Sequence, residues 1–298
     1  MCRASSFLLY RRVSSAWGRT LPFLSNGNRS PYGSVRHPPI RHIRSSSLSW
    51  DSQRGVKTDV DSSEFKKWHN GGGWIHSSAK VEPTVVVEIG AVVHSGSVLG
   101  ANVHLGSGAI VGPDVGIGQA TKIGYNASLC NCSIGDHCII HNGVSVGQDG
   151  FGFDVVEGRM LKKPQLLHAR IGNHVEIGAN SCIDRGSWRD TIIGDHSKID
   201  NLVQIGHNVV IGRCCMLCGQ VGIAGSVTLE DYVTLGGRVA VRDHVSIVSK
   251  VRLAANSCVT KSINEPGDYG GFPAVPIREW RKQIAKIRQI TKMPQSPK

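Results

Sequence analysis

The sequence predicts an all-β protein, a β-helix of hexapeptide repeats that is followed by a short C-terminal helix. Aliphatic residues recur at every sixth position from Ile193 to Val259 without interruption, and a small or β-branched residue such as Val203 stands four positions after each of them. A period of six fits neither the helical period near 3.6 nor the alternation of an ordinary strand. It is typical of a hexapeptide β-helix, in which three hexads close one triangular coil and the aliphatic side chains stack inside.

The same repeat predicts that the coil spans residues 75–263. The spacing begins at Ile75, shifts by one residue before Ile134, and gains four residues within DRGSWRDT, before Ile193. Residues 148–170 (QDGFGFDVVEGRMLKKPQLLHAR) break the repeat altogether. The flat sides of a β-helix carry few special groups, and binding residues concentrate on loops. We therefore expect this loop excursion to contact a ligand rather than to form a plain surface bulge, through Asp149, Phe151, Phe153, Lys162 and Gln165.

Residues 264–298 are predicted to contain a turn and then a helix. Glycines and prolines in NEPGDYGGFPAVP predict turns that end the coil. Four apolar residues then follow helical spacing: Ile277, Trp280, Ile284 and Ile287. The other face is basic, and it would either cap the stack as a solvated face or dock an acidic carrier. Its residues are Arg278, Arg281, Lys282, Lys286, Arg288 and Lys292.

Residues 1–50 are expected to be a mitochondrial transit peptide that directs the protein to the matrix. The segment contains eight Arg and many Ser but no Lys, Asp or Glu, and it lacks the long apolar core of a secretory signal. A tail without a function is the alternative. Two thirds of the net charge of +12 comes from this segment, so the charge does not indicate nucleic acid as a partner. Because no run of 18 apolar residues is present, we expect no membrane span.

The cysteines indicate free thiols in a reducing compartment. There are nine, an odd number, and several occupy small-residue positions of the coil. Cys214, Cys215 and Cys218 are spaced closely enough to suggest zinc, but zinc needs four converging ligands, and neighbouring side chains on a flat β-helix side point in opposite directions. We therefore predict no metal site.

The repeat brings His207 and Gly225 together. Gly225 follows His207 by 18 residues, one full coil, so the two should stack at the strand spacing of roughly 4.8 Å. A glycine leaves its backbone N–H open to a ligand. An imidazole beside it would be a general base next to an oxyanion donor, although a lone histidine on a β-helix wall is more often a surface residue. His244 lies two coils and one residue beyond His207, about 10 Å further along the wall.

The run DGFGF…KKPQ…IDRGSWRDTIIG…QIGHNVVIG, followed by INEPGDYGGFP, resembles the UDP-3-O-acylglucosamine N-acyltransferases of lipid A biosynthesis over residues 75–285. The resemblance implies a left-handed parallel β-helix, a homotrimer with active sites between subunits, and no cofactor. It implies that a 3-hydroxyacyl group moves from the phosphopantetheine of acyl carrier protein, the co-substrate, to the 2-amine of a UDP-sugar lipid precursor. It identifies His207 as the catalytic base, His244 as a second active-site histidine and Gly225 as the oxyanion donor. The polar residues that it implies for substrate binding are Asp200, which would orient charge, Asn201, Gln204 and Asn208.

The chain departs from that family where a separate N-terminal domain helps to bind uridine. Only residues 51–74 stand between the expected cleavage point and the coil. Phe65, Trp68 and Trp74 could replace that domain. Otherwise the chain binds the nucleotide weakly or uses a different sugar, and Trp68 and Trp74 simply pack under the first coil. Other functions remain open. The chain could be a different hexapeptide acyltransferase, one that acylates oxygen. It could also be a relative of the γ-type carbonic anhydrases, or a trimeric subunit without catalytic activity. The paired-histidine spacing of γ-type carbonic anhydrases is absent around His141, His196 and His207.

Overall fold

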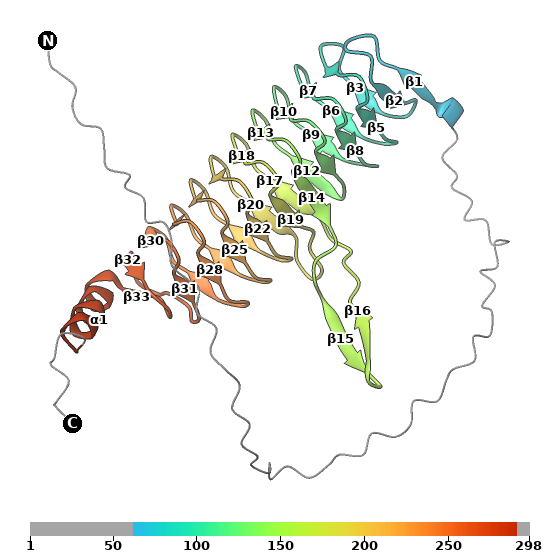
Figure 1. The fold of residues 1–298 in the computed structure, drawn as a ribbon. Coiled ribbons are helices and arrows are strands. Elements are labelled where there is room, and N and C mark those ends of the chain that lie inside the picture. The colour runs from blue at the N-terminus through green and yellow to red at the C-terminus, as the bar shows by residue number, and fades with distance from the viewer. Residues whose placement is uncertain (1–61, 291–298) are drawn as a thin grey trace, which may run out of the picture. The chain divides into compact units, whose positions relative to one another are not determined.

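The computed structural model describes residues 62–290, so the predicted transit peptide lies outside the described residues. All described residues belong to one compact unit. Within this unit, short parallel strands wind into a solenoid with three walls, and one helix stands at its C-terminal end (Figure 1). The predicted hexapeptide coil is confirmed.

Each wall is a ladder of short strands, because every coil contributes one strand to each wall. The first wall contains β1 (Phe65–Lys67), β2 (Trp74–His76), β5 (Val92–Val93), β8 (Ile110–Val111), β11 (Ser128–Leu129), β14 (Ser145–Gln148), β19 (Cys182–Asp184), β22 (Gln204–Ile205), β25 (Gly222–Ile223), β28 (Ala240–Val241) and β31 (Cys258–Val259). The second wall contains β4 (Val86–Val87), β7 (His104–Leu105), β10 (Lys122–Ile123), β13 (Ile139–Ile140), β18 (Glu176–Ile177), β21 (Lys198–Ile199), β24 (Met216–Leu217), β27 (Thr234–Leu235), β30 (Val251–Leu253), β32 (Gly267–Gly270) and β33 (Val275–Pro276). The third wall contains β3 (Lys80–Val81), β6 (Val98–Leu99), β9 (Gly116–Ile117), β12 (Cys132–Ile134), β17 (Ala169–Ile171), β20 (Thr191–Ile193), β23 (Val210–Ile211), β26 (Thr228–Leu229) and β29 (Ser246–Ile247).

The interior of the solenoid is a continuous stack of aliphatic side chains. Ile205 of β22 pairs with Ile223 of β25, which pairs with Val241 of β28, and all three side chains are buried. Burial of one such side chain contributes about 1.5–3 kcal/mol. The register that keeps these residues inside also aligns the outward-facing residues of successive coils.

The corners between the walls contain residues in the left-handed backbone region. Asn208, Ser226 and His244, with φ of 60°, 63° and 56°, occupy one corner in successive coils. The Ser226 N–H donates to the His207 carbonyl at 2.8 Å, and the His244 N–H donates to the Gly225 carbonyl at 3.1 Å. Asparagine and histidine tolerate this backbone region better than most residues. The corner therefore sets where the side chains of three coils leave the wall.

The excursion at residues 148–170 contains a β-hairpin. β15 (Phe153–Val156) pairs antiparallel with β16 (Arg159–Lys162), and the hairpin projects from the side of the solenoid (Figure 1). The side chains of both strands are exposed. At the base of the hairpin the chain stays against the coil, where Gly150 adjoins the His207 ring.

Residues 62–74 cover the first coil. The 3-10 turn η1 (Ser62–Glu64) leads into β1, which pairs antiparallel with β2. The Trp68 indole N–H donates to the Val85 carbonyl at 2.8 Å, and the ring packs against the core. Trp74 is 46% exposed. Trp68 is therefore a packing residue, whereas the Trp74 ring is open at the surface.

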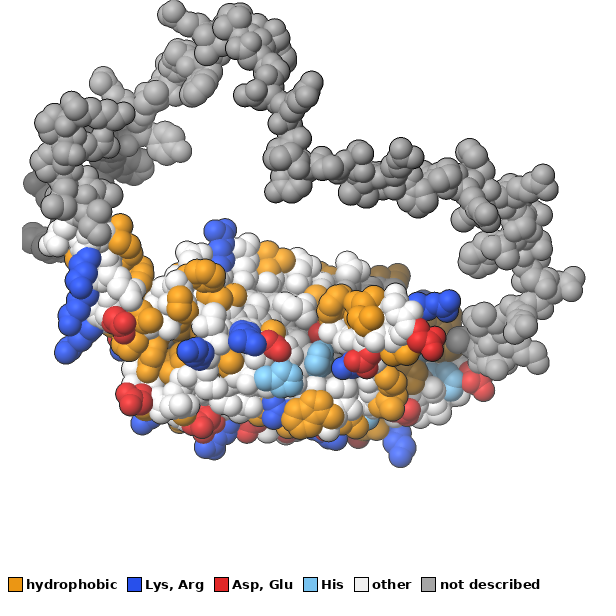
Figure 2. Space-filling view, turned by 90° about the horizontal axis from the view of Figure 1, so that it is seen from below, with side chains coloured by type: hydrophobic (Ala, Val, Ile, Leu, Met, Phe, Trp, Pro, Cys, Tyr) orange, Lys and Arg blue, Asp and Glu red, His pale blue; other side chains and the backbone are white. Residues whose placement is uncertain are grey.

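Two short strands and a helix complete the second wall. β32 pairs parallel with β30 and β33 pairs antiparallel with β32, so part of the segment predicted as turns is strand. α1 (Ile277–Ile290) confirms the predicted helix and packs against β32 and β33. Lys and Arg side chains gather at the end of the molecule that carries α1, beside apolar side chains (Figure 2). Between residues 62 and 290, no helix has the length and apolar character needed to cross a membrane.

Candidate active site

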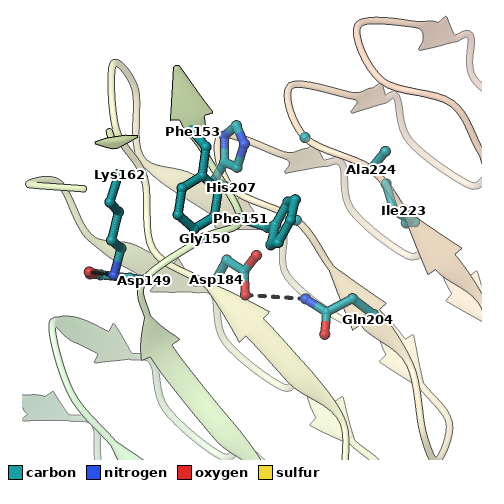
Figure 3. A pocket seen from close by; sticks show the side chains of 12 residues that line it. Asp149, Gly150, Phe151, Phe153, Lys162, Asp184, Gln204, His207, Ile223 and Ala224 are labelled. Carbon is teal, nitrogen blue, oxygen red and sulfur yellow. Dashed lines mark hydrogen bonds and ion pairs between the residues drawn. The ribbon is translucent and has the colours of Figure 1, made fainter. Parts of the chain in front are cut away.

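A cavity of about 570 Å³ lies where the base of the excursion meets the first wall. Its lining joins residues from three coils to residues from the excursion (Figure 3). They are Asp149, Gly150, Phe151, Phe153, Lys162, Asp184, Gln204, Gly206, His207, Ile223, Ala224 and Gly225. The cavity thus brings together most of the residues that the sequence analysis assigned to the site.

The His207 ring lies between two glycines. A Cβ atom placed on Gly225 would stand 2.8 Å from the ring Nε2, and one placed on Gly150 would stand 2.8 Å from the ring Cδ2. Any side chain at either position would therefore collide with the ring. The stacking expected from the 18-residue spacing of His207 and Gly225 is present.

The Gly225 backbone N–H is an unused donor beside this ring. Its neighbours Ala224 and Ser226 donate to carbonyls of adjacent coils, but the Gly225 N–H makes no hydrogen bond with the described residues. Gly225 also lines the cavity. Such a backbone N–H can receive the negative oxygen of a tetrahedral acyl-transfer intermediate.

Asn208 contacts the His207 ring from outside the cavity lining. The Asn208 side chain is buried, and its Nδ2 lies 2.7 Å from His207 Nδ1. Its Oδ1 accepts hydrogen bonds from the backbone N–H groups of Ser187 at 2.7 Å and Trp188 at 3.3 Å. Asn208 does not line the cavity, so the structure places this predicted substrate-binding residue behind the histidine.

The four extra residues before Ile193 form the support for Asn208. Arg189 of this insertion donates from Nε to the Asn208 carbonyl at 2.7 Å and from a terminal nitrogen to the Thr228 hydroxyl at 3.2 Å. Its guanidinium group lies 4.8 Å from the centre of the Trp188 ring. The insertion is therefore fastened to the coil of His207 and to the coil that follows it, a role that its sequence did not reveal.

Asp184 is the one titratable residue of the cavity lining that the sequence analysis did not assign to the site. It ends β19 within the IDRG motif and is 7% exposed. Its Oδ1 accepts hydrogen bonds from the side-chain amides of Gln148 at 2.9 Å and Gln204 at 3.2 Å. Burial raises its pKa to about 6 against the lowering effect of these bonds, and the charge of Asp149 adds to the increase. One signal in the sequence could have identified Asp184 as a site residue: it is an acid directly after the inward-facing Ile183.

Burial acts on His207 in the opposite direction. It lowers the pKa of the imidazole, and the positive charges of His244 and Lys163 lower it further. At neutral pH the ring is therefore uncharged, while Asp184 is ionised.

Residues of the excursion form the outer side of the cavity. Lys162 forms an ion pair with Asp149, whose other oxygen lies 3.9 Å from Arg185. The Phe151 and Phe153 rings pack edge to face with their centres 5.0 Å apart, and Phe151 is 85% exposed. These two rings give the cavity an apolar side across from the polar wall (Figure 3).

Four of the predicted site residues lie elsewhere on this chain. Asp200 and Asn201 line a separate cavity on the second wall, where Asn201 Oδ1 accepts a hydrogen bond from the Ala179 N–H. His244 is exposed and does not line the His207 cavity. Gln165 is buried outside the lining, and its Oε1 has no hydrogen-bond partner in the described chain. Among residues 62–290, no group of three His, Cys, Asp or Glu side chains is placed to hold a metal ion.

The fold and the repeat define a hexapeptide-repeat β-helix protein. Residues 190–225 match the family model "Bacterial transferase hexapeptide (six repeats)". A solved UDP-N-acetylglucosamine acyltransferase from Campylobacter jejuni has a TM-score of 0.53 at 22% identity, over 73% of this chain and 83% of its own. LpxA from Acinetobacter baumannii has a TM-score of 0.55 at 24% identity, over 75% and 84%. These likenesses confirm the predicted left-handed β-helix.

Two curated relatives are more similar in sequence. "Probable UDP-3-O-acylglucosamine N-acyltransferase 2, mitochondrial" of Arabidopsis thaliana is 65% identical over 245 residues, 81% of each chain. A UDP-3-O-acylglucosamine N-acyltransferase of Methylobacterium sp. (strain 4-46) is 48% identical over 171 residues, 57% of this chain and 49% of its own. The chain belongs to the UDP-3-O-acylglucosamine N-acyltransferase family, and it spans about half the length of the bacterial members that it matches.

Replacement of Asp184 by Asn should change how stability depends on pH. The pKa of Asp184 is about 6 in the folded chain and about 3.9 in an unfolded one. The stabilisation that the protonated Asp184 carboxyl gives to the folded state is therefore fully present below pH about 4. It is lost as the pH rises through about 6, by an amount on the order of 1–3 kcal/mol. The thermal midpoint of wild type minus that of Asp184→Asn should be larger at pH 5 than at pH 8. A difference that does not change with pH would contradict the raised pKa.

Proposed function

We propose that the protein transfers a 3-hydroxyacyl group from acyl carrier protein to the 2-amine of UDP-3-O-acylglucosamine, giving a UDP-2,3-diacylglucosamine. The observation that carries the proposal is the stacking of half-buried His207 on Gly225, whose N–H is free, in one cavity of a chain of this family. The direct test is acyl transfer by purified residues 51–298, with acyl carrier protein as donor. Absence of product with this acceptor and donor would overturn the proposal.

Aminolysis of a thioester makes two demands that this cavity fits. The amine must lose a proton as its nitrogen bonds to the carbonyl carbon, and the carbonyl oxygen gains negative charge. The Gly225 N–H is placed for the oxygen, while Asp184 and His207 are the titratable groups that the first wall contributes to the cavity. The sequence-based hypothesis assigns the proton to His207. The ring is required whether it accepts that proton or donates to the oxygen.

His207→Ala should lose most of the activity and leave the fold intact. We expect kcat to fall by about 10²–10⁴-fold, the range typical of removing a group that handles a proton. The ring lies on the outer wall between two glycines, so its loss opens no gap in the aliphatic core, and the thermal midpoint should change little.

His244→Ala is the matched control, because His244 occupies the same edge of the wall but is exposed and outside the cavity lining. His244→Ala should lower kcat less than His207→Ala does. A kcat of His207→Ala within about threefold of wild type would be far below the usual general-base effect and would contradict the assignment. A greater loss in His244→Ala would do the same.

We also propose that the protein is a homotrimer with active sites between subunits. Asp200 and Asn201 lie on the second wall and His207 on the first. The two sets can share one site only if the second wall of another copy faces the first wall of this one. Light scattering at micromolar concentration should give three times the mass of the chain, and a monomer would contradict this model of the active site.

The basic helix α1 is proposed to bind the acidic carrier. Trp280 and Ile284 line a cavity of about 480 Å³ along the helix, and basic side chains flank it. Replacing Arg281, Lys282 and Lys286 together by Ala should raise KM for the acyl carrier at low salt. It should also flatten the salt dependence of KM, since these interactions are screened over about 8 Å at physiological ionic strength.

A variant with Lys66, Lys67 and Lys80 changed to Ala is the control for this experiment. It removes the same charge from exposed positions near the first coil. Its KM for the carrier should stay close to that of wild type. An equal effect of the two triple variants would show that net charge, and not the helix, attracts the carrier.

We propose the mitochondrial matrix as the location. The support is the acid-free, Arg-rich composition of residues 1–50, together with the word "mitochondrial" in the name of the Arabidopsis relative. A matrix location also suits the free thiols, because none of the eight described cysteines forms a disulfide.

A further inference from the structure

Three histidine rings form a stack on the surface of the solenoid, outside the site described above. The rings of His137 and His174 have their centres 5.0 Å apart, and their planes are 5° from parallel. The rings of His174 and His196 have their centres 4.7 Å apart, and their planes are 3° from parallel. All three side chains are exposed, and none of them lines the His207 cavity. The histidine stack therefore has no part in the acyl transfer proposed above.

The stack is a consequence of the coil register. Its residues occupy the corner between the third and second walls in three successive coils, with φ of 55°, 55° and 62°. The His174 N–H donates to the Asp136 carbonyl at 2.8 Å, and the His196 N–H donates to the Asn173 carbonyl at 2.9 Å. These bonds hold the backbone of each histidine one coil from the next. The corner therefore presents three imidazoles side by side on a fixed backbone.

The ring nitrogens of the stack are available to a ligand. A neutral imidazole carries one N–H and one lone pair. Within residues 62–290, no side-chain hydrogen bond or ion pair engages any of the three rings. By contrast, His76, His104 and His141 each contact a glutamate, at 2.9 Å or less. The stacked rings thus keep their lone pairs for a partner outside this chain.

Acidic groups surround the stack. Asp136 and Asp195 each stand directly before one of its histidines. The opposing charge is the Lys198 ammonium group, which donates to the His174 carbonyl at 2.9 Å and lies 3.9 Å from Glu176. The net charge of these four side chains is negative. Their charge therefore favours a cation at the corner.

We propose that the histidine stack binds one divalent transition-metal cation, such as Zn²⁺ or Cu²⁺, through His174 and His196. Imidazole suits zinc, copper and nickel, whereas Mg²⁺ and Ca²⁺ take oxygen ligands. Two nitrogens that bind one zinc ion at about 2.0–2.1 Å in tetrahedral geometry stand about 3.3 Å from each other. A modest tilt of two exposed rings toward one another brings them to this separation, and water completes the coordination.

A site with two protein ligands agrees with the rest of the structure. Between residues 62 and 290, no three His, Cys, Asp or Glu side chains are placed to hold a metal ion together. The proposed site is therefore open to solvent, and a chelator should remove the cation. Because His174 stacks on both of its neighbours, the three rings accept one cation at a time. The bound cation would link the coil of His174 to the coil of His196.

The first experiment measures the binding of the metal alone. Full-length protein without a histidine tag is titrated with Zn²⁺ and, separately, with Cu²⁺ by isothermal titration calorimetry at pH 7.5. Wild type should bind both, Cu²⁺ more tightly, as the general order of affinities requires. The double variant His174→Asn/His196→Asn should bind one cation fewer per chain. Equal stoichiometry in the two proteins overturns the proposal.

Single variants then identify the ligands. Asparagine is the replacement because it tolerates the left-handed backbone, and Asn102 has φ of 59° at the same corner of an earlier coil. His174→Asn should raise the Kd for Zn²⁺ by at least the roughly 10–100-fold that loss of an outer-shell partner typically costs. His196→Asn should raise it less, since His137 and His174 remain stacked.

His168→Asn is the matched control, because His168 is an exposed histidine that belongs to no stack. Its Kd for Zn²⁺ should equal that of wild type. A wild-type Kd in His174→Asn, or an equal loss in His168→Asn, overturns the assignment of the ligands and with it the proposal.

The second experiment distinguishes a site of the folded chain from adsorption. A ligand that binds the folded but not the unfolded chain raises the thermal midpoint. The midpoint of wild type should rise with Zn²⁺ and return when a chelator is added, and that of the double variant should not respond. An equal rise in both proteins would place the cation elsewhere and overturn the proposal. Neither experiment reads acyl transfer, so the result is independent of the proposed function.

Discussion

The alignment of successive coils depends on the burial of one aliphatic side chain per wall and coil. A shift of one residue would turn each of these side chains outward, at a cost of about 1.5–3 kcal/mol for each position exposed. The register is therefore held over the whole solenoid. Outward-facing residues inherit this alignment, which is why Gly225 lies against His207 one coil earlier. The active-site geometry is a consequence of the packing of the core.

The site forms where the regular coil is interrupted twice. The excursion at residues 148–170 brings Gly150 against the His207 ring, and the insertion within residues 184–191 supports Asn208, which contacts the same ring. A regular coil offers only flat walls and shallow corners. The two interruptions make a cavity and also satisfy a buried amide, which would otherwise cost free energy as an unpaired polar group.

The parts of the structure that follow from spacing could be predicted from the sequence. The hexad period predicts the walls, the core and the stacking of His207 on Gly225, because register alone determines them. The role of Asn208 could not be predicted, since its partners are backbone groups of an insertion whose path no pattern specifies. Asp184 was missed for a related reason. Its burial comes from Gln148 and from Gln204, in coils before and after it, and from the overhanging excursion.

Asp200 and Asn201 show the limit of reasoning within one chain. They stand close to Gln204 in sequence, but a corner separates β21 from β22, so their side chains leave a different wall. Proximity in sequence indicates a shared site in a helix or a hairpin. In a three-walled coil, residues that are close in sequence can lie on different walls when a corner stands between them. Such residues share a site only if another copy brings the two walls together.

Burial has opposite effects on the two titratable groups that the first wall contributes to the cavity, and the result is one defined charge state. Desolvation disfavours any charged form, so it raises the pKa of the Asp184 carboxyl and lowers that of the His207 imidazole. At neutral pH the pair therefore carries a single negative charge, on Asp184.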